Sequence, residues 1–349
     1  MPLTLQVFDN PQLFLQAIDN ASNTVDSPSM NLVIGGAHDS SQTPGSNQRS
    51  IWMILHGQQG DGEEAIEISY DAQLASPAPI CMALCSQTLE TYHMATQDTE
   101  NGLLSKTPQL FDAVIRALDD AKLPQIHSMF GPKPCVDEFL ARWGAHVDPP
   151  LQLREQPFLD TRLAYMSLSE YHSGQREDGK YEILDLVTVP YDRSSPEMAA
   201  IHKQLVECVL DFWEANAGNE ERSAAAERMI NDVLDAREAG RIWICRPFGH
   251  EGEMAGYLYT GRETKHTIAI RNVYTREAFR GKGVARELVV ASCKWWLLDV
   301  DVEKRKQAVT LFVAPSNVAA TKSYLRSGFS IRDEPWEWRG FEDVSMGAF

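Results

Sequence analysis

A short basic turn containing two glycines carries the clearest chemical signal in this sequence. It reads RGKGVA at residues 280–285 and lies between a strand-like segment at 268–275 and an amphipathic, helical segment that ends near residue 298. The N-terminus of a helix leaves several backbone N–H groups unpaired and carries about half a positive charge. Glycines let the backbone close around an anion, and Arg280 and Lys282 add full charges. The pattern favours a diphosphate ligand, and its alternative is a basic, glycine-capped helix start without a ligand.

The turn differs from two other phosphate-binding motifs. It lacks the Gly-x-x-x-x-Gly-Lys-Ser/Thr pattern of a P-loop. It also lacks the third glycine of Gly-x-Gly-x-x-Gly, and no acidic residue suited to a ribose stands out at the expected distance. A nucleotide site of either of these kinds is therefore not expected.

The surrounding sequence resembles the GCN5-related N-acetyltransferase (GNAT) family. Arg280, Gly283 and Ala285 match its pyrophosphate signature, Arg/Gln-x-x-Gly-x-Gly/Ala. A strand-like segment at 309–314, then Asn317 and Tyr324 before Gly-Phe, continues the resemblance, which covers most of residues 180–340. The resemblance implies a mixed α/β fold, in which helices flank a mixed sheet, and acetyl-CoA as the cofactor with coenzyme A as a product.

The resemblance also implies which residues bind the cofactor. In the family, the strand before the turn offers backbone groups to the pantetheine arm, a role that falls here on residues 272–275. The turn and the first helical residues bind the pyrophosphate, and an asparagine after the next strand contacts the pantetheine. The predicted cofactor-binding residues are Val273, Tyr274, Thr275, Arg280, Gly281, Lys282, Gly283, Val284, Ala285 and Asn317.

Tyr324 is the predicted catalytic residue. It lies seven residues after Asn317, which corresponds to two turns along one face of a helix. The resemblance implies that a tyrosine at this position sits near the sulfur of acetyl-CoA and can protonate the departing thiolate. The alternative role is a packed aromatic residue on a short helix.

The sequence indicates no general base for the acceptor. No glutamate lies within residues 266–275. Glu253, Glu263 and His266 flank the strands that would face the acceptor, and Arg271 and Tyr274 lie on one of them. Each is more typical of a surface or packing residue, so no base is predicted.

The chain is expected to form two consecutive domains, residues 1–150 and residues 151–349. Residues 1–150 resemble the degenerate N-terminal half of tandem GNAT proteins, most clearly between 111 and 143. This half has no Arg-x-x-Gly-x-Gly/Ala turn, so no cofactor is expected there. Local signals predict a helix that begins near Asn10-Pro11, a helix over 221–240 that ends at Gly240, and a closing hairpin over 328–338.

Composition narrows the class of protein further. The 349 residues carry a net charge of −17, and residues 1–150, with 18 acidic and 6 basic side chains, contribute −12 of it. Such acidity argues against nucleic acid as a partner. The sequence shows neither a secretory signal nor an apolar run of about 20 residues, so no membrane partner is expected. Six scattered cysteines without zinc spacing suit a cytoplasmic protein with reduced thiols and no metal.

These observations together predict an acetyl-CoA-dependent N-acetyltransferase. The acceptor is expected to be the amine of a small molecule, because nothing in the sequence is typical of a chromatin-binding module. Two alternatives stay open. One is an acyl-CoA-binding sensor without turnover, and the other is an acyltransferase of the same fold that uses another acyl group or an oxygen nucleophile.

Overall fold

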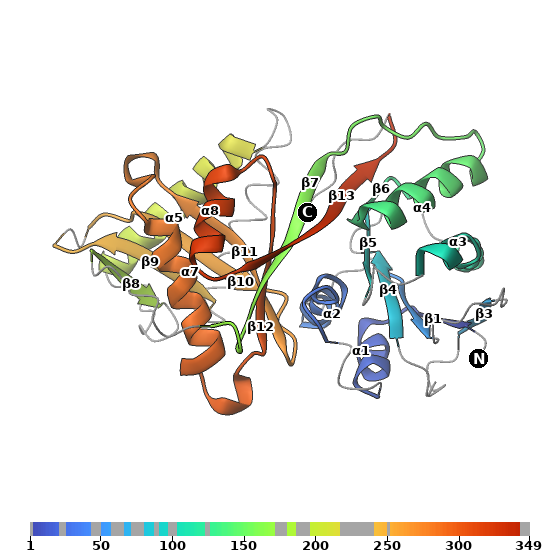
Figure 1. Cartoon of the computed structure of the whole chain (residues 1–349), viewed down its shortest axis with the longest axis horizontal. Helices are drawn as coiled ribbons and strands as arrows, with labels where there is room; N and C mark the ends of the chain where they lie inside the picture. Colours follow the sequence, from blue (N-terminus) through green and yellow to red (C-terminus); the bar gives the residue numbers. More distant parts are fainter. Residues whose placement is uncertain are drawn as a thin grey trace. The chain divides into compact units, whose positions relative to one another are not determined.

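The computed structural model describes residues 3–20, 26–42, 50–56, 66–70, 80–86, 91–96, 103–122, 126–171, 180–185, 196–216, 241–249 and 252–342. The chain forms two compact units. Unit 1 comprises Met1–Leu163, Arg262–Thr267 and Arg332–Phe349, and unit 2 comprises Ala164–Gly261 and Ile268–Ile331. Strands flanked by helices form both units, so the predicted mixed α/β class is confirmed (Figure 1).

Unit 1 contains a mixed sheet with the strand order β3-β1-β2-β4-β5-β6-β13. The pairs β1–β3 and β5–β6 are parallel, whereas β1–β2, β2–β4, β4–β5 and β6–β13 are antiparallel. The strands are β1 (Leu3–Phe8), β2 (Trp52–His56), β3 (Ile66–Ser69), β4 (Ile80–Ser86), β5 (Thr91–Thr96), β6 (Ser128–Pro132) and β13 (Ser330–Gly340).

Four helices accompany this sheet: α1 (Pro11–Asn20), α2 (Asn31–Gln42), α3 (Leu103–Asp120) and α4 (Lys133–His146). The predicted start of α1 is confirmed, because Asn10 accepts a hydrogen bond from the N–H of Gln12 at 2.7 Å. Helices α3 and α4 share one hydrophobic core with the sheet, in which the rings of Phe111 and Phe139 lie 5.3 Å apart. The other face of β2 packs against α1, where Phe14 lies 5.3 Å from Trp52.

The closing hairpin predicted over 328–338 is wrong. Residues Ser330–Gly340 form one continuous strand, β13, which pairs antiparallel with β6 so that Trp336 lies opposite Pro132 and Trp338 opposite Phe130. Local sequence signals suggested the hairpin. Pairing with a strand about 200 residues earlier in the chain overrides them, because it buries Trp336 and Trp338 almost completely.

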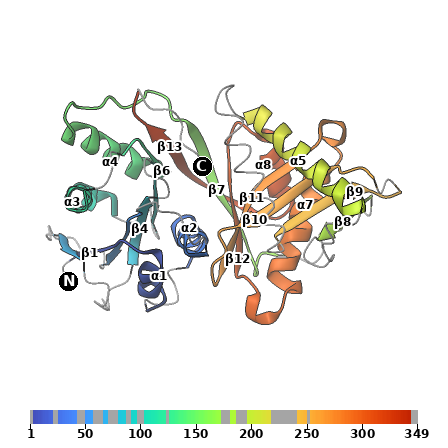
Figure 2. The same cartoon turned by 180° about the vertical axis from the view of Figure 1, so that it is seen from behind.

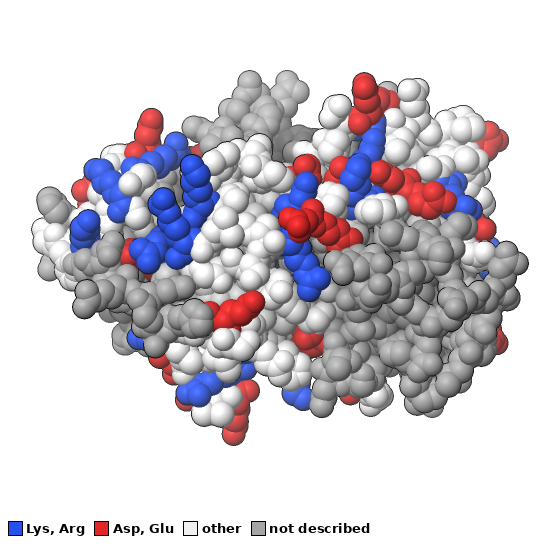
Figure 3. Space-filling model, viewed as in Figure 1, with Lys and Arg blue, Asp and Glu red and all other residues white. Residues whose placement is uncertain are grey.

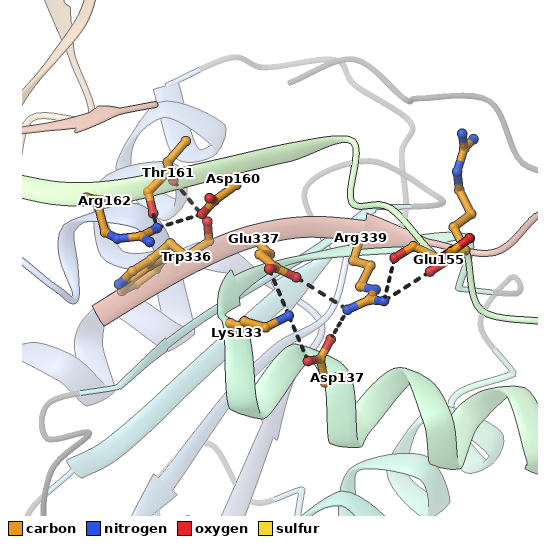
Figure 4. A network of polar contacts seen from close by, with 10 residues as sticks. Lys133, Asp137, Glu155, Asp160, Thr161, Arg162, Trp336, Glu337 and Arg339 are labelled. Atoms are coloured by element: carbon orange, nitrogen blue, oxygen red, sulfur yellow. Dashed lines mark hydrogen bonds and ion pairs between the residues drawn. The ribbon is translucent and has the colours of Figure 1, made fainter. Parts of the chain in front are cut away.

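A network of charged groups links β13 to α4 (Figure 4). The buried carboxylate of Glu337 lies 2.8 Å from Nζ of Lys133. Arg339 contacts Asp137 at 2.6 Å and donates to the backbone oxygen of Glu155 at 3.1 Å. These contacts hold the C-terminal strand to unit 1 at both a helix and the segment that precedes β7.

Unit 2 contains a sheet with the strand order β7-β12-β11-β10-β9-β8. Its strands are β7 (Leu159–Ser167, which begins in unit 1), β8 (Tyr181–Asp185), β9 (Ile242–Pro247), β10 (Gly256–Gly261), β11 (Thr267–Thr275) and β12 (Ala308–Val313). Helices α5 (Pro196–Asn216) and α7 (Val284–Lys294) cover opposite faces of this sheet (Figures 1 and 2). The unit is completed by α8 (Val318–Arg326), and the helix predicted over 221–240 lies outside the described residues.

Helix α7 ends differently from an ordinary helix. The predicted end near residue 298 is confirmed, but the last turn, Trp295–Asp299, is a π-helix. Its Trp296 packs on Trp243 of β9, with ring centroids 6.3 Å apart. The wider turn fits two consecutive tryptophans at the end of the core.

Cys135, Cys208, Cys245 and Cys293 are free, buried thiols. Within the described ranges, no three histidine, cysteine, aspartate or glutamate side chains gather in a way that could hold a metal ion. Of the helices that the structure describes, none has the length and apolar character needed to cross a membrane.

Candidate active site

The loop between β11 and α7 has the backbone of an anion-binding turn. A short 3₁₀ turn, Glu277–Phe279, follows β11, and Gly281 and Gly283 then adopt left-handed φ angles of +72° and +94°. Gly283 is the N-cap of α7 and offers no capping side chain to the first N–H groups. A Cβ atom at Gly281 or Gly283 would meet nothing within 4 Å, so the outer side of this backbone is open.

Positive charge gathers around this loop. Arg280 and Lys282 are exposed, and Arg280 is anchored by a hydrogen bond from its Nε to the backbone oxygen of Thr275 at 3.3 Å. Lys322 and Arg326 are exposed on α8. Figure 3 shows lysine and arginine side chains clustered over this part of unit 2. In a chain with a net charge of −17, this basic patch favours a polyanionic ligand.

Arg276 has a different role from the other basic residues of the loop. Its guanidinium points to α5, where it contacts Glu207 at 2.8 Å and donates to Sγ of Cys208 at 3.2 Å. Its backbone N–H donates to the oxygen of Ala255 at 2.9 Å, which ties the end of β11 to the start of β10. Sequence reasoning missed this residue, because its partners lie about 70 positions earlier and no local pattern marks them.

The strand β11 presents the residues predicted to face the pantetheine. Tyr274 turns its side chain to α5, and its hydroxyl donates to Asp211 at 3.3 Å. Burial, followed by the nearby Asp211 charge, raises the pKa of Tyr274. The Tyr274 side chain therefore serves packing, which leaves its backbone as the group for the predicted cofactor contact.

Three polar side-chain atoms on elements around the loop are buried without a hydrogen-bond partner. They are the hydroxyls of Thr275 at the end of β11 and Thr321 on α8, and Nε of Arg286 in the first turn of α7. Among the described residues, no group satisfies these atoms. Buried polar atoms are normally paired, so these three fit a site whose ligand supplies polar groups.

Helix α8 and its N-cap carry two of the predicted site residues, Asn317 and Tyr324. Asn317 is the N-cap of α8, and its Oδ1 accepts from the N–H of Ala320 at 3.1 Å. Tyr324 is half-buried and its ring packs against Phe329 at 5.9 Å. Burial raises the pKa of Tyr324 to about 12, so its hydroxyl stays protonated at neutral pH. A protonated hydroxyl is what an acid for a leaving thiolate requires.

The flanking residues give no base. Glu253 is exposed, whereas Glu263 and His266 belong to the stretch around Arg262–Thr267 that is part of unit 1. The backbone N–H of His266 donates to Asp26 at 2.8 Å, within that unit. Neither β10 nor β11 carries a carboxylate.

Comparisons with known proteins bear on the same region. Residues 204–329 match the model of the acetyltransferase (GNAT) family. A mycothiol acetyltransferase of Corynebacterium aurimucosum is 28% identical over 130 residues, which are 36% of this chain and 41% of that protein. The match thus spans less than half the length of this relative.

Two solved structures are similar over nearly the whole chain at low sequence identity. A Drosophila protein has 10% identity and a TM-score of 0.53, with 95% of each chain covered. A GCN5-related N-acetyltransferase from Sphaerobacter thermophilus has 13% identity and a TM-score of 0.49, with 97% of this chain and 94% of that chain covered. Only the former likeness, with its TM-score above 0.5, supports a shared fold, and it says nothing about activity.

Proposed function

From the match of residues 204–329 to the model of the acetyltransferase (GNAT) family, we propose that the chain is an acetyl-CoA-dependent N-acetyltransferase. The observation that carries the proposal is the open, glycine-built N-terminus of α7 beneath a basic patch. It lies inside the matched region and fits the pyrophosphate of coenzyme A.

The cofactor would be held by three elements. The loop and first turn of α7, residues 280–285, would bind the pyrophosphate through backbone N–H groups and the charges of Arg280 and Lys282. The backbone of Val273, Tyr274 and Thr275 would pair with the pantetheine, as an added strand pairs with a sheet edge. Asn317 and the unpaired hydroxyl of Thr321 would reach it from α8. When bound, acetyl-CoA supplies the thioester that an amine can attack.

Tyr324 acts in this proposal as the acid at the sulfur. Its hydroxyl keeps its proton because burial raises the pKa to about 12, and the ring is held by Phe329. With acetyl-CoA bound, Tyr324 would give its proton to the leaving sulfur, so that coenzyme A would depart as a free thiol, and solvent would then reprotonate the Tyr324 phenolate.

The acceptor in this proposal is the amine of a small molecule, and the protein acts in the cytoplasm. Residues 1–150 are proposed to be a degenerate GNAT-like domain without a cofactor, which supports the catalytic domain in residues 151–349.

Isothermal titration with acetyl-CoA tests the cofactor assignment. The wild type should bind with a micromolar Kd, and Gly283→Glu should weaken binding at least a hundredfold, because it adds a side chain and a negative charge at the phosphates. Gly249→Glu is the matched control: Gly249 also has a left-handed φ of +76° and open space around it, but it follows β9. Equal loss in both variants, or no binding to the wild type, would overturn the proposal.

Thiol release separates an enzyme from a sensor. Wild-type protein that binds acetyl-CoA should release free thiol when small amines are added, and the product mass should rise by one acetyl group. Binding without thiol release across a broad panel of amines and alcohols would instead favour an acyl-CoA sensor. Release with alcohols alone would favour an oxygen nucleophile.

A further inference from the structure

The turn that joins β10 to β11 is held by two side chains from residues 26–31. The turn, Arg262–Thr267, belongs to unit 1, whereas β10 and the rest of β11 belong to unit 2. The carboxylate of Asp26 accepts hydrogen bonds from the hydroxyl of Thr264 and the backbone N–H of His266, both at 2.8 Å. It also accepts one from the hydroxyl of Thr267 at 3.2 Å. One carboxylate thus binds three donors of a single turn.

Helix α2 has a matching place for the same turn. Asn31, its first residue, is buried and donates from Nδ2 to the backbone oxygen of Arg262 and to Oγ1 of Thr267, both at 2.8 Å. Gly35 follows on the same helix, and a Cβ atom there would come within 2.5 Å of Cβ and 2.7 Å of the backbone oxygen of Arg262. Because glycine lowers the stability of a helix, its presence at this contact indicates a site shaped for the turn.

The backbone of the turn needs such support. Arg262 is buried and has a left-handed φ of +50°, which is unfavourable for a residue with a side chain and persists only where the surroundings hold it. Beyond it, the N–H of Thr264 donates to the backbone oxygen of Thr267, and the N–H of Thr267 donates to Oγ1 of Thr264, both at 2.9 Å. These bonds close the turn where β11 starts, so a hold on the turn fixes the position of the first residue of β11.

Burial alone does not set the register of these two strands. Every residue of β10 is buried, and so are residues 267–270, the first four of β11. Strands that are buried on both faces lack the alternation of buried and exposed residues that penalises a slip by one position. The pairing also shifts within the hairpin, where Tyr259 lies opposite Asn272 and Thr260 lies opposite Ile270. The turn is therefore the feature that can fix the register.

We propose that Asp26, together with Asn31, is a positioning residue that holds β11 in the register that cofactor binding requires. Asp26 acts through the turn, and the turn acts through β11, which ends in the predicted cofactor contacts at residues 273–275. The effect on binding rests on the proposed acetyltransferase function, whereas the hold on β11 does not. A strand that samples a second register is competent to bind only part of the time, and the apparent Kd rises by the inverse of the competent fraction.

Hydrogen exchange and calorimetry of full-length variants test the proposal. Asp26→Ala should speed exchange roughly tenfold or more at the amide of His266, which loses its acceptor, and at the amides of residues 268–271. The Kd for acetyl-CoA should rise roughly threefold to tenfold, as expected for a competent fraction between about one third and one tenth. Asp26→Asn, which keeps one oxygen as an acceptor, should change both quantities less. Thr264→Val, which removes the hydroxyl on the other side of the contact, should resemble Asp26→Ala.

Lys133→Met distinguishes positioning from a loss of stability. It breaks another polar contact of unit 1, that of Lys133 with Glu337, and should lower the free energy of unfolding without changing the Kd or the exchange of residues 266–271. If Asp26→Ala does not fold, Asp26→Asn and Thr264→Val decide. Variants that bind acetyl-CoA as tightly as the wild type, or that exchange residues 266–271 no faster than Lys133→Met, would overturn this inference alone. A wild type that does not bind acetyl-CoA would instead overturn the proposed function, and hydrogen exchange would still decide whether Asp26 holds β11.

Discussion

At the scale of single residues, Tyr324 allows a sharp test of the chemistry. Tyr324→Phe removes one oxygen and keeps the ring that packs on Phe329, so the fold should be retained. If the hydroxyl protonates the thiolate, turnover should fall by roughly 10² to 10⁴, the range for proton transfer by a positioned side chain. The Kd for acetyl-CoA should change less than twofold. Steady-state rates and titration calorimetry on the same preparations measure both quantities.

The pH dependence of the same residue follows from its burial. Burial raises the pKa of Tyr324 to about 12, so the hydroxyl keeps its proton above the usual tyrosine pKa of about 10. The wild-type rate should therefore not fall near pH 10. A fall near pH 10 that disappears in Tyr324→Phe would contradict this expectation. Tyr181→Phe, on the edge strand β8, is the control and should keep wild-type turnover. Equal turnover in Tyr324→Phe and Tyr181→Phe would mean that Tyr324 is only a packing residue.

At the scale of elements, substitutions of Arg276 and Arg280, the two arginines of the loop, should change different properties. The first should lower stability and the second should weaken cofactor binding. Arg276→Met breaks the contacts to Glu207 and Cys208 that hold the end of β11 to α5. It should lower the free energy of unfolding by about 1 kcal/mol, a modest value because Glu207 is 46% exposed. Arg280→Met removes an exposed charge beside the proposed phosphates, and should weaken acetyl-CoA binding about tenfold with stability changed by less than about 0.5 kcal/mol.

Urea unfolding and calorimetry of the two variants form one comparison. The opposite pattern, with binding lost in Arg276→Met and stability lost in Arg280→Met, would exchange the two roles. Salt adds a further check, because the affinity of wild type should fall with ionic strength more steeply than that of Arg280→Met.

Elements that depend on local sequence could be predicted, and those that depend on distant partners could not. The start of α1 at Asn10-Pro11 and the glycine turn before α7 follow from residues next to one another. The continuous strand β13 was missed because its partner β6 lies about 200 residues away. A bulge in β11, where Asn272 pairs with Tyr259 and Ile270 with Thr260, was missed for a related reason: a bulge is a property of two strands in register, and β11 alone contains no sign of it.

At the scale of the whole molecule, the units are not consecutive segments of chain. Unit 1 includes Arg332–Phe349 from the far end of the sequence, and its sheet ends in β13. Composition and local periodicity cannot reveal such an arrangement, because both β7 and β13 look like ordinary strands of the C-terminal half. Whether residues 1–150 are a degenerate GNAT-like domain stays a prediction.

The contribution of β13 to unit 1 predicts how fragments of the chain should behave. A fragment of residues 1–163 leaves β6 without its partner and removes Trp336, Trp338 and Phe341, which are at most 2% exposed. Large buried aromatics cost about 3–5 kcal/mol each when truncated, and a domain has only about 5–15 kcal/mol in total. The fragment also loses the Glu337 contact to Lys133. It should therefore not unfold cooperatively in urea, whereas the same fragment joined to residues 332–349 by a flexible linker should.

A matched control makes this test specific to the strand. The linked fragment with Trp336→Ala and Trp338→Ala keeps the backbone of β13 but loses the two side chains that the pairing with β6 buries, and it should behave like residues 1–163 alone. Near-ultraviolet circular dichroism and urea titration distinguish the three fragments, since only a packed core gives both a tertiary signal and a cooperative transition. If residues 1–163 alone give both, unit 1 does not need β13 to fold. The C-terminal strand would then add to a core that is already complete, and the long return of the chain from unit 2 would serve to connect the units.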